Sequence, residues 1–380
     1  MNMSLTLLFI FTFVILLAIE MGYIPLARKN HWSTERNKRN DGHPVTVIGG
    51  GIIFYIAMVI WSLSMGILYN QTEIGANFLV GTTMLAACSF ADDVLQLKVW
   101  IRLVVQFVAI LFLGFQCNLF EQPTALWPLF MICSVAFVNA YNFMDGINGI
   151  TAAYSITVLG IFLYLDIFQV HFIPETLIAF SLISLLIFAF FNFRRRAIVF
   201  AGDVGSITMG YIVAAVLIYY ILKVHTFTAI VFVIVYGVDT FMTVMRRASE
   251  GENIFKPHRK HIYQMLNYVW HIPQRTIAMS YALLQLGISV VYLQIEDPLS
   301  RIAYSLCITG TLTALYFILM MASENRRRHI EEQRRRGQER NTLGIRKRRR
   351  RKKRKEEAPA TRHVTQDYPE KVAGFNDNWN

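Results

Sequence analysis

Long runs of apolar residues, separated by short polar segments, make up most of the first 322 positions of the chain. A run of about 20 apolar residues is long enough to cross a lipid bilayer as an α-helix. The pattern predicts an all-α, polytopic integral membrane protein with about eleven transmembrane helices. The expected spans lie near 4–25, 47–69, 76–91, 101–118, 125–141, 150–168, 174–192, 206–222, 226–244, 275–294 and 300–322.

Basic residues between the runs predict how the helices cross the membrane. Arg28 and Lys29 follow the first run, and no Lys or Arg precedes it. This order argues against a cleaved signal peptide and places the N-terminus outside. With that topology, Lys223 and Arg301 are the basic residues expected outside, and the other basic residues between spans lie inside. The sequence therefore predicts a cytoplasmic C-terminus.

The tail after residue 325 differs in composition from the rest. It holds 19 of the 37 Lys and Arg residues, so the net charge of +12 belongs mainly to this tail. Its charge blocks lack apolar periodicity, which is typical of a disordered segment. We expect a multi-span domain over 1–324 and a basic, disordered cytoplasmic tail over 325–380. Anionic membrane lipids are its expected partners, and nucleic acid is not expected, since the tail lacks interleaved aromatic residues.

Five polar clusters stand beside the predicted spans, and the predicted topology places all five on the cytoplasmic side. They are "HPVTVIGGG" (43–51), "ADDV" (91–94), "NAYNFMDGINGI" (139–150), "FAGDVGS" (200–206) and "KPHRKHIYQ" (256–264). Each cluster alone has an ordinary explanation, such as a glycine turn or a helix-end charge. Their common side indicates one functional site, because ionisable groups at membrane depth are costly and usually functional.

The residue types in these clusters suit a phosphate substrate and a hard metal ion. Carboxylates are offered by Asp92, Asp93, Asp145 and Asp203. Mg²⁺ is typically held by one or two carboxylates, with waters and substrate phosphates as its other ligands. Neighbouring glycines allow close approach of phosphate oxygens to the backbone. We therefore expect a cytoplasm-facing site for a pyrophosphate substrate, with Mg²⁺, or alternatively Mn²⁺, as the cofactor.

In residue type and order, the five motifs resemble those of the polyprenyl-phosphate N-acetylhexosamine-1-phosphate transferases over about residues 1–322. The resemblance implies transfer of a sugar 1-phosphate from a UDP-sugar to undecaprenyl phosphate, with release of UMP. This is the first membrane step of cell-surface polysaccharide synthesis, for example of O-antigen, at the bacterial inner membrane. N-acetylglucosamine 1-phosphate is the group expected first. UDP-N-acetylfucosamine and UDP-N-acetylquinovosamine are alternative donors, and a homodimer is left open.

The resemblance also implies roles for single residues. Asp92 and Asp93 match the family's paired aspartates and are the expected catalytic residues. Asp203 matches the aspartate that binds Mg²⁺, and Asp93 is the expected second metal residue. The expected substrate-binding residues are His43, Asn142, Asp145, Phe200 under the uracil, His258, Arg259 and His261.

Departures from the family pattern make the expected residue roles and the expected branch of the family more specific. Asn148 stands where many relatives have Asp, so no metal or base role is expected there. The loop reads "HRKHIYQ" rather than the "HHH" of the peptidoglycan translocase, which favours the sugar-transferase branch. Two other classes stay open. An intramembrane prenyltransferase needs a second Asp-rich motif, and a secondary transporter needs polar groups near mid-membrane.

Overall fold

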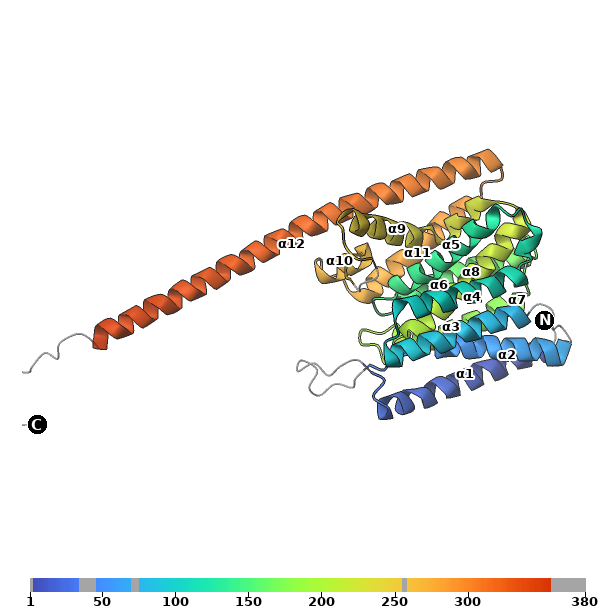
Figure 1. Cartoon of the computed structure of the whole chain (residues 1–380), viewed down its shortest axis with the longest axis horizontal. Coiled ribbons are helices and arrows are strands. Elements are labelled where there is room, and N and C mark those ends of the chain that lie inside the picture. Colours follow the sequence, from blue (N-terminus) through green and yellow to red (C-terminus); the bar gives the residue numbers. More distant parts are fainter. Residues whose placement is uncertain (1–2, 34–45, 70–74, 255–257, 357–380) are drawn as a thin grey trace, which may run out of the picture. The chain divides into compact units, whose positions relative to one another are not determined.

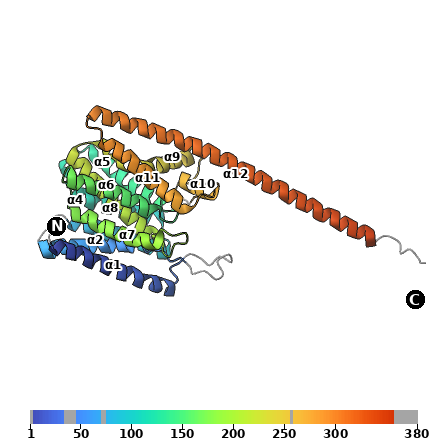
Figure 2. The same ribbon diagram turned by 180° about the vertical axis from the view of Figure 1, so that it is seen from behind.

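The structure is a computed structural model that describes residues 3–33, 46–69, 75–254 and 258–356. Within these residues the chain is helical and has no strands beyond two isolated β-bridges. It divides into two compact units, Met1–Glu324 and Asn325–Asn380. Figures 1 and 2 show the helices of the first unit packed side by side as a bundle.

The helices follow one another with short connections. They are α1 (Met3–Lys29), α2 (Ile52–Tyr69), α3 (Ala76–Leu95), α4 (Val99–Gln116), η2 (Leu119–Glu121), α5 (Leu126–Phe143), α6 (Ile150–Phe168), α7 (Glu175–Asn192), α8 (Gly202–Val224), η3 (Phe227–Val233), α9 (Ile234–Ser249), α10 (Ile262–Tyr268), α11 (Gln274–Leu293) and α12 (Pro298–Glu356). The first unit contains α12 up to Glu324, and the remainder of this helix belongs to the second unit.

Among the described residues, ten segments are long and apolar enough to cross a membrane, and α2 is a shorter apolar helix. Together these eleven elements match the eleven predicted spans, so the prediction of an all-α polytopic membrane protein is confirmed. The short helix α10 was not predicted, because its seven residues are too few to show a clear period.

Burial separates central helices from peripheral ones. Between 61 and 67% of the apolar window is buried in α6, α7, α8 and the η3–α9 segment, against 22% in α5. Large apolar side chains such as Ile67 of α2 and Leu306 of α12 are exposed on the peripheral helices. A soluble protein rarely exposes so much apolar surface, whereas lipid is a suitable solvent for it.

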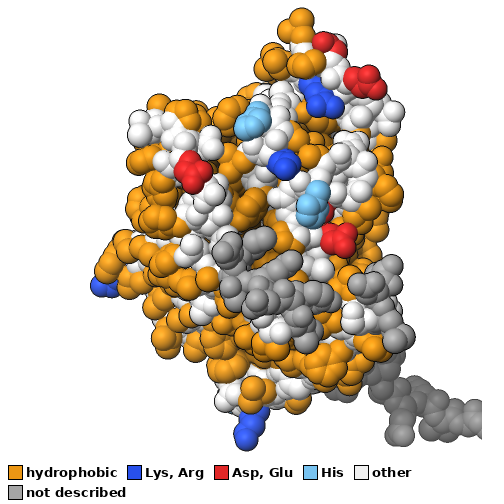
Figure 3. Space-filling view, turned by 90° about the vertical axis from the view of Figure 1, so that its right-hand side faces the viewer, with side chains coloured by type: hydrophobic (Ala, Val, Ile, Leu, Met, Phe, Trp, Pro, Cys, Tyr) orange, Lys and Arg blue, Asp and Glu red, His pale blue; other side chains and the backbone are white. Residues whose placement is uncertain are grey.

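Figure 3 shows the end of the first unit where α1 begins and α11 ends. Charged and histidine side chains are few on this face, and most of it is apolar or neutral polar. The last turn of α3 and the first turn of α8, which carry the predicted carboxylates, belong to the other end of the bundle.

A short pairing of two loops fixes the start of α8. The Phe200 amide donates to the Val47 carbonyl at 2.8 Å, and the Gly50 amide donates to the Phe200 carbonyl at 3.0 Å. Gly51 then packs directly on α8, because a Cβ added to it would lie 2.3 Å from the Cα of Gly205. The glycines of the 43–51 motif therefore bring the start of α2 against the start of α8.

The tail differs from the prediction. Residues 325–356 are helical, so the predicted disorder is wrong for this stretch, and residues 357–380 lie outside the described part. Arg, Lys, Glu and Gln are strong helix formers, and no proline occurs between Pro298 and Pro359. Arg327 also pairs with Glu331 one turn later at 2.9 Å. Charge blocks alone therefore did not predict the backbone conformation.

The Gly51–Gly205 contact predicts a stability effect. Gly51→Ala should lower the free energy of unfolding by about 1–3 kcal/mol, because the added methyl group meets backbone atoms that have no room to move. Thermal unfolding in detergent measures the change. Gly160→Ala in α6 is the matched control, since a Cβ there would meet nothing within 4 Å. Equal unfolding temperatures for the two variants would contradict the close packing.

Candidate functional site

The predicted aspartates of α3 and α8 lie together. Both oxygens of Asp93 accept hydrogen bonds from the start of α8, from the amides of Asp203 at 2.9 Å and Val204 at 3.1 Å. The first amides of a helix have no partner within the helix, and they favour negative charge. Gly202 permits this contact, because its φ is +71° and a Cβ there would lie 2.5 Å from the Asp93 Oδ2 atom. Asp93 is therefore the cap of α8.

An arginine links the other two carboxylates. The Arg102 Nη1 atom of α4 lies 2.6 Å from the Asp92 Oδ2 atom and 3.1 Å from the Asp203 Oδ2 atom. The remaining oxygen of Asp92 accepts a hydrogen bond from the Leu97 amide at 2.6 Å. One guanidinium thus offsets the repulsion between two carboxylates at the membrane face.

Sequence reasoning missed Arg102 as a site residue. It was counted only among the basic residues that orient the protein in the membrane. The available signal was a single charge inside the apolar run 101–118, ten positions after Asp92. Such a charge at membrane depth is expensive and calls for a nearby partner.

The 139–150 motif lies beside these carboxylates. Ser206 of α8 donates to the Asn142 Oδ1 atom at 2.9 Å, and Thr151 donates to the Asp145 Oδ1 atom at 2.5 Å. The pKa of Asp145 is raised to about 6, mainly by burial and also by the charge of Asp93, while the Thr151 hydrogen bond opposes the rise. Asn142 and Asp145 therefore belong to the same site as the carboxylate cluster.

Asn148 has a structural role. Its buried side-chain amide donates to the Arg194 carbonyl at 3.1 Å, and its backbone amide donates to Gln274 of α11 at 2.9 Å. The absence of a metal or base role for Asn148 stays a prediction.

Phe200 directly precedes the first turn of α8 and is partly exposed. No ring–ring contact among the described residues involves it, so its ring face is not taken up by another aromatic side chain. The predicted substrate residue His43 lies outside the described residues.

The histidine loop between α9 and α10 packs on the end of α5. The His258 ring centroid lies 4.9 Å from that of His261 and 6.3 Å from that of Phe143. Burial lowers the pKa of His258 to about 4, helped by the neighbouring His261 and Arg247, so its ring is neutral at pH 7. The Arg259 guanidinium lies over the Tyr268 ring at 4.9 Å from the centroid.

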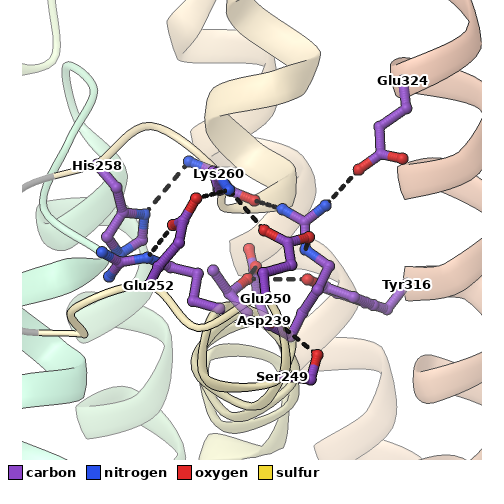
Figure 4. A network of polar contacts seen from close by, with 11 residues as sticks. Asp239, Ser249, Glu250, Glu252, His258, Lys260, Tyr316 and Glu324 are labelled. Atoms are coloured by element: carbon purple, nitrogen blue, oxygen red, sulfur yellow. Dashed lines mark hydrogen bonds and ion pairs between the residues drawn. The ribbon is translucent and has the colours of Figure 1, made fainter.

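Ion pairs hold this loop, as Figure 4 shows. Lys260 contacts both Glu250, at 2.7 Å, and Glu252, which also pairs with Arg247 at 3.1 Å. Hydrogen bonds to the two glutamates raise the pKa of Lys260 against the opposing effect of its desolvation. The charge of Lys260 is therefore balanced inside the loop, and this lysine is a structural residue rather than a free phosphate ligand.

The carboxylates could bind a hard metal ion whose remaining ligands are substrate phosphates and water. Among the described residues, no group of three or more His, Cys, Asp or Glu side chains converges as a metal cage. Mg²⁺ needs only one or two carboxylates when phosphates and water complete its shell. Asp203 could provide one, because its side chain is 30% exposed and its Oδ2 atom already faces a cation, Arg102. Asp93 is less suited, because backbone amides bind both of its oxygens.

The cavity at the cluster is too small for a sugar nucleotide. It measures about 10 Å³, room for about one water molecule, and lies between α3, α4 and α8 beside Arg102 and Asp203. A larger cavity of about 430 Å³ is lined by the end of α2 and the start of α3, including Trp61 and Leu79. It lies at the other end of α3 from the carboxylates.

Comparison with known proteins finds similar chains in several bacteria. A probable undecaprenyl-phosphate N-acetylglucosaminyl 1-phosphate transferase of Bacillus subtilis (strain 168) is 28% identical over 233 residues, which are 57% of this chain and 64% of the relative. Phospho-N-acetylmuramoyl-pentapeptide-transferases of Streptococcus sanguinis (strain SK36) and Latilactobacillus sakei subsp. sakei (strain 23K) are 26% and 28% identical over 253 and 283 residues. These alignments cover 60% and 66% of this chain, and 75% and 83% of the relatives.

The chain thus spans less than two thirds of the length of the Bacillus subtilis relative. Residues 76–221 match the model of glycosyl transferase family 4, and this segment contains Asp92, Asp93, Arg102, the 139–150 motif and Asp203. By this match and these relatives, the chain is similar to glycosyl transferase family 4 over residues 76–221.

Proposed function

We propose that this protein transfers a sugar 1-phosphate from a UDP-N-acetylhexosamine to undecaprenyl phosphate and releases UMP. The observation that carries the proposal is the cluster of Asp92, Asp203 and Arg102 at one end of the spanning helices, beside the 139–150 motif. The name of the Bacillus subtilis relative supports N-acetylglucosamine 1-phosphate as the transferred group.

The proposed reaction joins a membrane lipid to a water-soluble nucleotide sugar. An oxygen of the prenyl phosphate attacks the β-phosphorus of the UDP-sugar. The bond from this phosphorus to the bridging oxygen breaks, and UMP leaves with that oxygen and its electron pair. A site at the ends of spanning helices suits both partners, because the lipid phosphate stays at the membrane face while its prenyl chain lies among apolar side chains.

The contacts indicate a different role for each acidic residue. Asp93 caps α8 and so fixes Asp203, which would hold Mg²⁺. Mg²⁺, when bound, neutralises the charge that develops on the phosphate of departing UMP. Asp92 stays beside Arg102, whose guanidinium is held in place by Asp92 and Asp203 together.

The substrate residues surround this centre. Asn142 and Asp145 would line the nucleotide, Phe200 would stack on the uracil, and His258 and His261 would contact the diphosphate, with Arg259 as a further cation. The role of His43 stays a prediction.

The proposal includes an orientation and a role for the tail. UDP-sugars are made in the cytoplasm, so the site faces inward in the inner membrane and the N-terminus lies outside. Residues 326–355 hold 17 Lys and Arg residues, and we propose that they bind anionic lipid head groups at about 1 kcal/mol per residue.

A second donor is favoured by two of the relatives, which are named as phospho-N-acetylmuramoyl-pentapeptide-transferases. The "HRKHIYQ" loop argues against it. A panel assay separates the two. Protein purified in detergent is given undecaprenyl phosphate, Mg²⁺ and one UDP-sugar at a time, and released UMP is measured. We expect UMP from a UDP-N-acetylhexosamine. Prenyl-dependent UMP release from none of the donors would refute the transferase proposal.

Asp203→Asn should abolish most of the UMP release, because it removes the negative charge of the proposed metal ligand while keeping the shape of the side chain. Loss of one charge-stabilising ligand costs about 10²- to 10³-fold in kcat. The unfolding temperature should stay within a few degrees of wild type. A well-folded variant with normal kcat would remove Asp203 from the site.

Asp93→Ala should lower both activity and stability. It removes the cap of α8, which costs about 0.5–2 kcal/mol of unfolding free energy. Asp297→Ala is the matched control, because Asp297 accepts a hydrogen bond from the Ser300 amide in the same way at the start of α12. The control should keep its activity. If Asp93→Ala kept full activity, the cap would not position the site.

Phe200→Ala should weaken binding of the UDP-sugar by about 10- to 100-fold, because base–aromatic stacking is worth about 1–3 kcal/mol. Titration calorimetry with UDP measures the loss. Phe168→Ala removes an exposed ring at the end of α6 and should leave UDP binding unchanged. Normal UDP affinity in Phe200→Ala would show that this ring only packs against the protein.

A further inference from the structure

A buried aspartate outside the carboxylate cluster gathers hydrogen-bond donors from three helices. Asp239 of α9 is 5% exposed. Its Oδ1 atom lies 3.1 Å from the Ile262 amide, 3.3 Å from the Thr243 hydroxyl and 3.4 Å from the His261 Nδ1 atom. Its Oδ2 atom accepts from the Tyr281 hydroxyl of α11 at 2.8 Å.

His261 connects this aspartate to the candidate site. Its side chain is 1% exposed, and its ring lies between Asp239 and the rings of His258 and Phe143. While Nδ1 faces Asp239, the buried Nε2 atom has no hydrogen-bond partner among the described residues. A buried polar atom without a partner is costly and calls for a ligand or an ordered water molecule.

Two groups compete for the Nδ1 atom. The backbone amide of Gln264 approaches the His261 side chain as in a helix cap, and it would use Nδ1 as an acceptor. The Asp239 carboxylate only accepts, so it needs a proton on Nδ1. Loss of a hydrogen-bond donor costs the buried Asp239 carboxylate more than loss of an acceptor costs the neutral amide of Gln264 in the first turn of α10. The proton therefore belongs on Nδ1.

We propose that Asp239 is a positioning residue of the transferase: it keeps the Nδ1 proton of His261 and turns Nε2 toward the diphosphate of the UDP-sugar. This inference rests on the proposed function. Phosphate oxygens only accept hydrogen bonds, so Nε2 takes a proton from solvent when the substrate binds. The ring is then a cation between Asp239 and a phosphate oxygen, and the carboxylate stabilises that cation.

Figure 4 shows Asp239 beneath the ion pairs of the histidine loop. The Ile262 amide ties the first residue of α10 to the same carboxylate, and Tyr281 ties it to α11. Asp239 therefore sets both the proton position and the orientation of the His261 ring. Asp239→Asn keeps an acceptor for the Ile262 amide, so it alters the charge with little change in shape.

The first test does not depend on catalysis. The full-length protein is labelled with ¹⁵N-histidine and studied by NMR in detergent without substrate, and the His261 signals are assigned by their absence in His261→Gln. We expect a protonated Nδ1 in the wild type and a changed pattern in Asp239→Asn. A wild-type His261 with a bare Nδ1 overturns the proposal, whether or not the protein is a transferase.

The second test is a double-mutant cycle on kcat/KM for UMP release. Asp239→Asn and His261→Gln should each lower it by at least about tenfold, and the double variant should be within about twofold of His261→Gln alone. Additive losses would show that Asp239 does not act through His261 and would overturn the proposal.

Tyr281→Phe is the matched control for the cycle. It removes one hydrogen bond to the same carboxylate but leaves the contact with His261. It should lower the unfolding temperature while keeping kcat/KM within about threefold of wild type. A loss as large as that of Asp239→Asn would assign a structural role to the whole group and overturn the proposal. A wild type that releases no UMP would refute the proposed function instead, and the NMR result would still decide the role of Asp239.

Discussion

The two hydrogen bonds from the first amides of α8 to Asp93 are the interaction on which the site depends. A helix that begins at the membrane face leaves amides without partners, and lipid offers no acceptors for them. A carboxylate from α3 satisfies two of these amides and is favoured there by the helix dipole. The same contact fixes the side of α8 that carries Asp203, and so brings Asp203 to the guanidinium that also pairs with Asp92.

The surrounding structure protects this arrangement. Gly51 and Gly202 allow backbone segments to approach the start of α8 more closely than any larger residue would permit. The pairing of 46–51 with 197–201 presents Phe200 beside the cluster. On the other side, ion pairs around Lys260 and the buried Asp239 hold the histidine loop against the end of α5. Acidic groups, glycine turns and a histidine loop thus meet at one end of the bundle.

Much of this could be predicted from the sequence because membrane proteins obey strict rules of hydropathy. The apolar runs gave the spans, and their ends located Asp92, Asp145 and Asp203 on one side. Arg102 was not recognised, because one arginine near a span end also has a topological explanation. Asp239 was not recognised either, because it lies within an apolar run and its partner His261 is 22 positions away. The helical tail was missed because solvation of charges does not determine backbone conformation.

The central claim is that the bond cleaved is the one between the two phosphates of the nucleotide sugar. The most direct measurement follows the label of [β-³²P]UDP-N-acetylglucosamine in a reaction with undecaprenyl phosphate, purified protein and Mg²⁺. We expect the ³²P to enter the organic phase in a lipid that also carries the sugar, while unlabelled UMP stays in water. If the sugar entered the lipid and the ³²P stayed in water as UDP, the protein would be a simple glycosyl transferase, and the sugar 1-phosphate reaction would be contradicted.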